Sequence, residues 1–312
     1  NWTYWTGTAL ATNHGRAFQS LVGSSPTFAQ VDVASGTTPY TNGFRKCLKI
    51  TNGNQTSGAG SSDYLYFWYI LEAQDVAKSG WNYTSSSSHI TISYWVKSSV
   101  AQNFYGMMQS DDGTAQNYVW ETGSLTADTW TKIVKTIPGN SNLQFDNNTS
   151  AGLYVAPIRA FDGTGRTASM SLETWAAYSS SSRTPDATST FYTTNDATLE
   201  FTGLQIEVGT QATAFEHRSA GEELALCQRY YQEYTSISNR IYTQNVYRVH
   251  HPLPVEMRGA PTVTKSYGTS TNLATDNTTA STKMLKWDIQ YTGAGNGIID
   301  IINGTITLDA DI

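Results

Sequence analysis

The chain consists largely of short runs in which apolar and polar residues alternate, and clusters of Gly, Ser, Asn and Asp separate these runs. Apolar residues at the helical spacings of three and four positions are nearly absent. Alternation with a period of two is typical of a strand that buries one face. The pattern therefore predicts an all-β fold, either a sandwich or a barrel. The sequence has no fixed-period repeat that would indicate a solenoid or a propeller.

The clearest runs belong to a large N-terminal β-domain. In His89–Val96, the residues Ile90, Ile92, Tyr94 and Val96 fall on one face of the expected strand. Further strands are expected at Tyr105–Gln109, Trp130–Ile137, Gly152–Ala156 and Leu199–Val208.

Two runs depart from clean alternation. Asp63–Glu72 (DYLYFWYILE) is aromatic on both faces, which indicates a central strand that is covered on both sides or keeps one side for a partner. In Trp130–Ile137, the neighbours Ile133 and Val134 are both apolar. This pair indicates a β-bulge or burial of both faces.

The pattern changes after Phe215. Ser219–Ala225 predicts one short helix, with Ser219 as N-cap and Glu222 as its capping-box partner. Beyond the helix, strands are expected at Pro261–Lys265, Lys283–Tyr291 and Gly297–Leu308, and the two prolines of Arg248–Arg258 indicate an edge strand or an extended connector. We therefore expect a β-sandwich over residues 1–218, and a helical joint with a smaller β-domain over residues 219–312.

The joint is rich in charge, although the chain as a whole is not. Arg218, Glu222, Glu223 and Arg229 are expected to form a charge network. The apolar residues of the joint are expected to pack between the two domains, and they are Leu224, Leu226, Tyr230 and Tyr231.

Charged residues make up only 14% of the 312 residues, and the formal net charge is −6. Uncharged polar residues must then cover the surface. This surface composition is typical of secreted proteins and virion surfaces. No basic run is present, so nucleic acid and anionic membranes are not expected partners. No apolar run approaches the roughly 20 residues of a membrane span, so membrane insertion is not expected. Cys47 and Cys227 are interpreted as buried thiols, and a long-range bridge between them remains open.

The acidic residues do not form a recognisable catalytic pair. Glu200 and Glu207 share a strand, but Gln205 between them breaks an acidic ladder. The adjacent Glu222 and Glu223 diverge by about 100° on a helix. No catalytic residue is therefore assigned.

The histidines do not predict a metal site. His250 and His251 point to opposite faces of a strand and do not chelate one ion. No metal site and no cofactor are expected.

Aromatic side chains are the best candidates for ligand contact, because sugars stack their C–H faces on aromatic rings. The candidate ligand-binding residues are Trp175, Tyr178, Trp120, Tyr66 and Trp68. Trp175 and Tyr178 stand out because they lead directly into the polar loop Ser179–Thr188. The alternative is core packing, since a sandwich of this size needs large buried residues. Core packing is favoured for Trp68, Trp95 and Trp130, and it remains open for Trp120 and Trp175.

Several segments occur in the same order as in a known family. They are Ile70–Val76, Ile90–Ser98, Trp130–Gly139, Phe201–Gly209, Ala212–Arg218, Gly221–Tyr231 and Pro254–Val263. On these segments the chain resembles a family of tailed-phage structural proteins that is common in marine and cyanobacterial phages. The resemblance implies a jelly-roll first domain similar to carbohydrate-binding modules.

The same resemblance implies a place on the virion surface, as a tail fibre, receptor-binding protein or head-fibre component. The expected partners are a host surface glycan, other virion proteins and further copies of the chain, with a homotrimer as the expected oligomer. Two alternatives remain open. One is a purely structural decoration or connector protein, and the other is a polysaccharide-degrading enzyme on the same scaffold.

Overall fold

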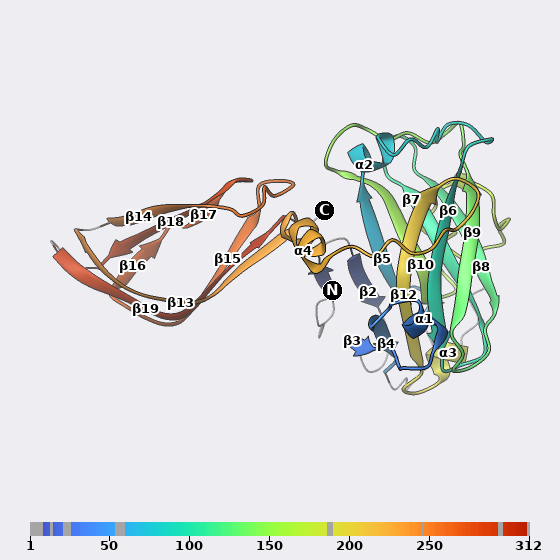
Figure 1. Cartoon of the computed structure of the whole chain (residues 1–312), viewed down its shortest axis with the longest axis horizontal. Coiled ribbons are helices and arrows are strands. Elements are labelled where there is room, and N and C mark those ends of the chain that lie inside the picture. Colours follow the sequence, from blue (N-terminus) through green and yellow to red (C-terminus); the bar gives the residue numbers. More distant parts are fainter. Residues whose placement is uncertain are drawn as a thin grey trace. The chain divides into compact units, whose positions relative to one another are not determined.

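The structure is a computed structural model of the chain, and it describes residues 9–12, 15–20, 26–53, 60–185, 190–244, 246–292 and 296–310. The chain divides into two compact units, Asn1–His217 and Arg218–Ile312. They are called unit 1 and unit 2 and are described one at a time (Figure 1).

Unit 1 contains two antiparallel sheets. Sheet A has the strand order β3 (Thr27–Asp32), β4 (Lys46–Thr51), β12 (Thr198–Val208), β6 (His89–Ser98) and β9 (Thr131–Pro138). Sheet B has the order β1 (Ala9–Thr12), β2 (Gly15–Ser20), β5 (Tyr64–Glu72), β10 (Ala151–Asp162), β7 (Asn103–Ser110), β8 (Gln116–Ser124) and β11 (Ala176–Ala177). Three short helices lie in the connections, and they are α1 (Thr38–Thr41), α2 (Ala73–Ala77) and α3 (Thr190–Thr193).

The strand order identifies unit 1 as a jelly roll. Without β1, β2, β3 and β11, the two sheets read β4-β12-β6-β9 and β5-β10-β7-β8. Among these eight strands, the chain crosses from one sheet to the other at nearly every connection, and only β7 and β8 follow each other within a sheet. A double Greek key of eight strands in two sheets has this order. The all-β class and the jelly-roll expectation are thus confirmed.

The core lies between the two sheets, and strand β6 shows how the sequence builds it. Ile90, Ile92, Tyr94 and Val96 each expose 3% or less and belong to one continuous cluster. This is the face that the alternation predicts. The cluster also takes Phe67 from β5 on the opposite sheet, whose ring centroid lies 5.4 Å from that of Phe201.

Strand β5 is covered on both faces, as its sequence predicts. Leu65 and Phe67 enter the core, while Tyr66 and Trp68 on the other face expose only 4% and 6%. The expected bulge at Ile133 and Val134 is wrong. Strand β9 pairs with β6 in unbroken register, with Ile133 buried and Val134 45% exposed, so the second apolar residue simply faces outward.

A buried ion pair holds a connection onto the outer face of sheet B. Arg159 and Asp162, both fully buried, form a two-bond pair in which Arg159 Nη2 donates to Asp162 Oδ1 at 2.7 Å. The Arg159 guanidinium lies 3.7 Å from the ring centroid of Tyr66. Burial acts to lower the pKa of Arg159, but Asp162 and Tyr66 outweigh it and raise that pKa. Thr184, on the connection after β10, donates to Asp162 at 3.5 Å.

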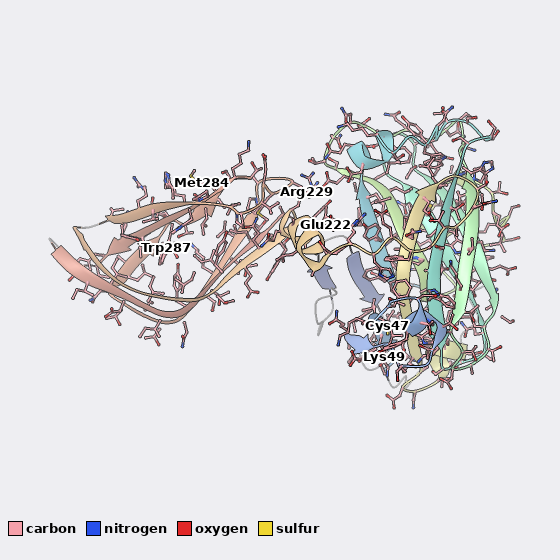
Figure 2. The ribbon with its side chains drawn as sticks, viewed as in Figure 1. Cys47, Lys49, Glu222, Arg229, Met284 and Trp287 are labelled. Atoms are coloured by element: carbon pink, nitrogen blue, oxygen red, sulfur yellow. The ribbon has the colours of Figure 1, made fainter. Side chains whose placement is uncertain are left out.

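Unit 2 is a smaller pair of antiparallel sheets. One contains β13 (Tyr231–Gln244), β19 (Asn296–Asp309) and β15 (Thr262–Thr271), and the other contains β14 (Val246–Pro252), β18 (Met284–Tyr291), β16 (Leu273–Asp276) and β17 (Thr279–Ala280). Their core is formed mainly by the apolar residues of β18 and β19. Trp287 on β18 is 4% exposed, whereas Met284 at the start of that strand is 39% exposed (Figure 2). Strand β14 lies at a sheet edge, in agreement with its terminal proline, Pro252.

Helix α4 (Ala220–Gln228) opens unit 2 and confirms the expected capping box. Ser219 Oγ accepts from the Glu222 amide, and the Ser219 amide donates to the Glu222 carboxylate at 2.8 Å. Leu224 and Leu226 are 57% and 40% exposed, and their expected packing between the two domains stays a prediction. The hydrophobic stripe of α4 is too weak to bury a face, and the helix has no buried residue. Among the described helices, none has the length and apolarity to cross a membrane.

We expect Asp162→Ala to destabilise unit 1 by about 3–5 kcal/mol, because it leaves the buried Arg159 charge without its partner. The double variant Arg159→Met/Asp162→Leu removes both charges and should recover most of that loss. Urea denaturation of the full chain, followed by tryptophan fluorescence, measures both effects. The signal reports mainly on unit 1, since Trp287 is the only tryptophan in unit 2. Equal losses in the two variants would contradict the role of charge.

Candidate functional site

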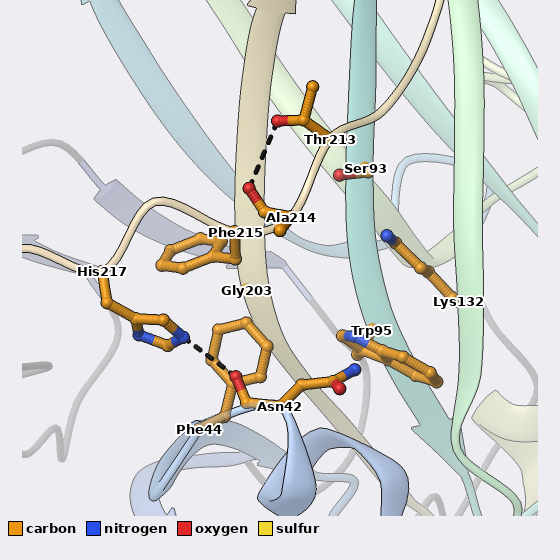
Figure 3. Close-up of a pocket in the computed structure, with 10 residues that line it drawn as sticks. All are labelled: Asn42, Phe44, Ser93, Trp95, Lys132, Gly203, Thr213, Ala214, Phe215 and His217. Atoms are coloured by element: carbon orange, nitrogen blue, oxygen red, sulfur yellow. Dashed lines mark hydrogen bonds between the residues drawn. The ribbon is translucent and has the colours of Figure 1, made fainter.

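A pocket of about 260 Å³ lies on the outer face of sheet A (Figure 3). Strands β6, β9 and β12 form its floor. The segment after α1 and the segment that follows β12 form its walls. Its described lining residues are Asn42, Phe44, Ser93, Trp95, Lys132, Gly203, Thr213, Ala214, Phe215 and His217.

The alternation of β6 places Trp95 on the pocket floor. Since the even positions of this strand fill the core, Ser93 and Trp95 point to the opposite face. Trp95 pairs directly with Lys132 on β9 and with Thr202 on β12, so their side chains stand side by side on the outer face. The Trp95 side chain is partly exposed, and Lys132 is exposed.

One wall is an extended segment, Gly209–His217, which we call the strap. Two side chains of β12 hold it. The side-chain amide of Gln205 donates to the backbone carbonyl of Ala214. It also accepts from the backbone N–H of Glu216 at 2.8 Å. The Glu207 carboxylate accepts from the Thr213 amide at 3.1 Å and from the Thr213 hydroxyl. Burial acts to raise the pKa of Glu207, but these hydrogen bonds and the charge of Lys132 outweigh it and leave that pKa below its usual value.

Three rings line the pocket where the strap meets the segment after α1. Phe44, Phe215 and His217 contact one another with ring centroids 4.8–5.2 Å apart. The His217 ring also makes a 2.9 Å hydrogen bond from Nε2 to the Asn42 carbonyl oxygen. Gly203 sits under the Phe44 ring with a positive φ of 67°, and a Cβ there would lie 2.5 Å from that ring. Glycine at this position therefore lets the Phe44 ring rest on the sheet.

Three polar side chains line the pocket without a hydrogen bond or an ion pair to the described part of the chain. They are those of Asn42, Ser93 and Lys132. No carboxylate is among the ten lining residues. The arrangement offers an aromatic surface edged by an amide, a hydroxyl and an ammonium group. Such a site suits a ligand with one apolar face and a polar rim.

The acidic residues near the pocket do not form a catalytic pair. Glu200 is held by Lys97 at 2.9 Å, and Glu207 is held by the strap. The thiol of Cys47 lies 3.7 Å from Glu200, and burial and then this carboxylate raise the pKa of Cys47 to about 12. A thiol with so high a pKa is a poor nucleophile. Cys47 carries a free thiol, and Cys227 on α4 is partly exposed rather than buried.

Two of the candidate residues, Trp120 and Trp175, lie in or beside the core. Trp120 exposes none of its surface, and its indole N–H donates to the Tyr94 hydroxyl at 3.1 Å. It covers Gly106 on the neighbouring strand, with which it pairs. Trp175 is 8% exposed, donates to the Pro138 carbonyl at 2.7 Å and packs on the Tyr118 ring. Both indoles are thus used structurally.

The other three candidates, Tyr66, Trp68 and Tyr178, come together on the outer face of sheet B. Arg183 links two of them, donating from Nη1 to the Tyr66 hydroxyl at 3.2 Å and from Nη2 to the Tyr178 hydroxyl at 2.6 Å. Tyr66 and Trp68 are buried, and Tyr178 is partly exposed. Of the loop expected at Ser179–Thr188, residues 186–188 lie outside the described residues. No candidate residue lines the pocket on sheet A.

The pocket residues could be found only in part from the sequence. The alternation of His89–Val96 places Trp95 on the face opposite the core, so the core assignment of Trp95 is corrected. Nothing local shows that Phe44 and His217, far apart in the chain, meet there. No group of three or more His, Cys, Asp or Glu side chains that could hold a metal occurs in the described part of the chain.

No protein-family model and no curated protein matches the chain. Among solved structures, the enzymatically active domain of bacteriophage CBA120 tailspike protein 4 is 5% identical, with a TM-score of 0.33, over 62% of this chain and 19% of that one. A family 11 carbohydrate-binding module of a Clostridium thermocellum cellulosomal cellulase is 10% identical, with a TM-score of 0.31, over 67% and 98%.

The CBM22-1–GH10 modules of a Clostridium thermocellum endo-1,4-β-D-xylanase, complexed with xylohexaose, are 11% identical, with a TM-score of 0.30, over 68% and 29%. The chain thus spans only a small part of the tailspike and xylanase chains. At these identities and TM-scores, the likenesses say nothing about what this chain binds.

We expect Gly203→Ala to destabilise unit 1 and to disorder the Phe44 wall, because the new methyl group enters the Phe44 ring. Gly36→Ala is a matched control, since Gly36 also has a positive φ (84°) but no atom within 4 Å of the position that a Cβ would take. Both variants carry backbone strain, so the difference between them isolates the clash. We expect Gly203→Ala to cost about 1–3 kcal/mol more than Gly36→Ala in urea denaturation. Equal losses of stability in the two variants would show that the Phe44 ring moves aside at no measurable cost.

Proposed function

We propose that the chain is a non-catalytic glycan-binding protein, and that the pocket over Trp95 is its sugar site. One observation carries the proposal: a partly exposed indole lies among three polar side chains that have no partner within the described chain. A pyranose ring has an apolar C–H face that packs on an aromatic ring, and its hydroxyls take hydrogen bonds at the edge. Asn42, Ser93 and Lys132 offer these bonds without breaking any protein contact.

The size of the pocket supports weak binding of a short sugar segment. Its volume of about 260 Å³ is at the lower end for small-molecule sites. A single small site gives modest affinity. Several linked copies on one oligomer would raise the effective affinity by avidity, with no new contact.

The biological setting we propose is the surface of a phage virion, with the chain acting as a tail fibre, receptor-binding protein or head-fibre component that attaches to host surface glycans. The ordered segments shared with tailed-phage structural proteins support this setting. The low proportion of charged residues, 14%, is consistent with an extracellular surface. We further propose that the chain is a homotrimer that contacts other virion proteins. Residues 1–218 then form the glycan-binding domain and residues 219–312 the joint and assembly domain.

A purely structural decoration or connector role is the second candidate, and a different observation favours it. Large apolar side chains are exposed at several places in unit 2, and they are Leu224, Leu226, Val246, Met284 and Ile302. Exposed apolar groups of this kind suit contacts between subunits.

Trp95→Ala should weaken glycan binding by roughly tenfold or more, because it removes the stacking surface while the core face of β6 is kept. The measurement is a glycan array with the full chain, followed by calorimetric titration of the best ligand. Tyr178→Ala is the comparison variant, since it alters the aromatic group on the other sheet. We expect it to bind as the parent chain does. Loss of binding in Tyr178→Ala alone would move the sugar site to sheet B, and an array without any signal would favour the structural role.

Light scattering on the purified full chain should give the mass of a trimer. Leu224→Glu/Leu226→Glu should shift that mass toward the monomer if the exposed leucines of α4 contribute to assembly, because the new carboxylates would be buried without a partner. Val134→Glu is the matched control, since it makes the same change at an exposed apolar residue of unit 1 and should leave the mass unchanged. A parent chain that is monomeric at all concentrations would contradict the oligomer.

A further inference from the structure

Lys132 is the one formally charged side chain among the ten described residues that line the pocket. It stands directly across from Trp95 in the β6–β9 register, and its ammonium end is directed over the pocket (Figure 3). The lining therefore combines an aromatic ring with a positive charge and contains no carboxylate.

Lys132 makes no ion pair with the described part of the chain, whereas three lysines on the strands of sheet A do. Lys46 pairs with Asp32 at 2.5 Å, Lys97 with Glu200 at 2.9 Å and Lys135 with Glu173 at 2.7 Å. Within the described residues, Lys132 has no carboxylate at ion-pair distance.

Glu207 is the carboxylate whose pKa responds to Lys132, but its oxygens are already engaged. The Thr213 amide and hydroxyl bind its two oxygens, and these bonds hold the strap in place. Glu207 therefore stays with the strap, and the Lys132 ammonium remains available to a ligand.

We propose that the pocket selects acidic sugars, with the sugar ring against Trp95 and its carboxylate or sulfate group on Lys132. This inference rests on the proposed glycan-binding function. The charge-assisted hydrogen bond from an ammonium to an acid group is stronger than one to a neutral hydroxyl.

The overall charge of the chain sharpens the inference. A net charge of −6 repels acidic glycans at long range, so a preference for them must come from a local positive group. The preference should therefore depend on Lys132 alone rather than on the general surface.

The test is an array of paired glycans that differ only in the acid group. The pairs are uronic acid oligosaccharides with their methyl esters, sialylated with desialylated oligosaccharides, and sulfated with desulfated oligosaccharides. The full chain should bind the acidic member of at least one pair about five- to tenfold more tightly. The type of pair that responds distinguishes a carboxylate from a sulfate.

The variants then assign the effect to one residue. Lys132→Gln should reduce the acid-to-neutral ratio to near one while changing the affinity for the neutral member by less than about twofold. Lys46→Gln removes the same charge from an ion-paired site on the same sheet, and its ratio should stay at the parent value. Trp95→Ala should weaken both members of the pair.

Three results would contradict the inference, and they differ in whether the glycan-binding function is also excluded. Equal binding of both members of every pair, still lost in Trp95→Ala, would leave the glycan site in place and remove the acidic preference. Binding of neither member of any pair would remove the glycan-binding function together with the preference. An acidic preference that survives Lys132→Gln would also contradict the assignment.

Discussion

The register of β6 is the constraint on which both the core and the pocket depend. This strand lies inside sheet A between β12 and β9, and its even positions from Ile90 to Val96 fill the core. The odd positions, including Ser93 and Trp95, must then lie on the outer face. A slip of one residue would place Trp95 in the core and expose the isoleucines, at a cost in apolar burial that no new contact offsets. The pocket floor is thus a consequence of the same alternation that drives folding.

The strap converts this flat outer face into a pocket, and polar side chains of the sheet hold it there. An isolated stretch of irregular backbone gains little from a sheet surface, since its amides keep their bonds to water. Gln205 and Glu207 replace that water at three positions, and Phe215 adds ring contacts with Phe44. Each of these bonds is exposed to solvent and contributes a modest net stabilisation. The strap is therefore held by several small terms that act together.

Local features could be predicted from the sequence, and long-range ones could not. The capping box at Ser219 and the strand at His89–Val96 follow from residues within a few positions of each other. The fate of Trp120 depends on Gly106 across a strand pair, and the role of Gln205 depends on the strap returning over its own strand. The pocket needs Phe44, Trp95 and Phe215 to meet, and no spacing in the sequence encodes that meeting. Aromatic composition alone therefore suggested sheet B, where the rings are used to hold the connection after β10.

The two faces of unit 1 use their polar side chains in different ways. On sheet B, Arg183 binds two tyrosine hydroxyls and Arg159 is paired with Asp162, while Arg159 Nη1 and Arg183 Nε are buried without a hydrogen-bond partner among the described residues. A sugar on this face would have to displace some of these protein bonds. On sheet A, the pocket side chains of Asn42 and Lys132 lack partners within the described residues. A ligand there gains hydrogen bonds and gives up only water. The aromatic cluster on sheet B is thus built into the contacts that hold the connection after β10, while Trp95 on sheet A is partly exposed beside polar side chains that form no hydrogen bond within the described residues.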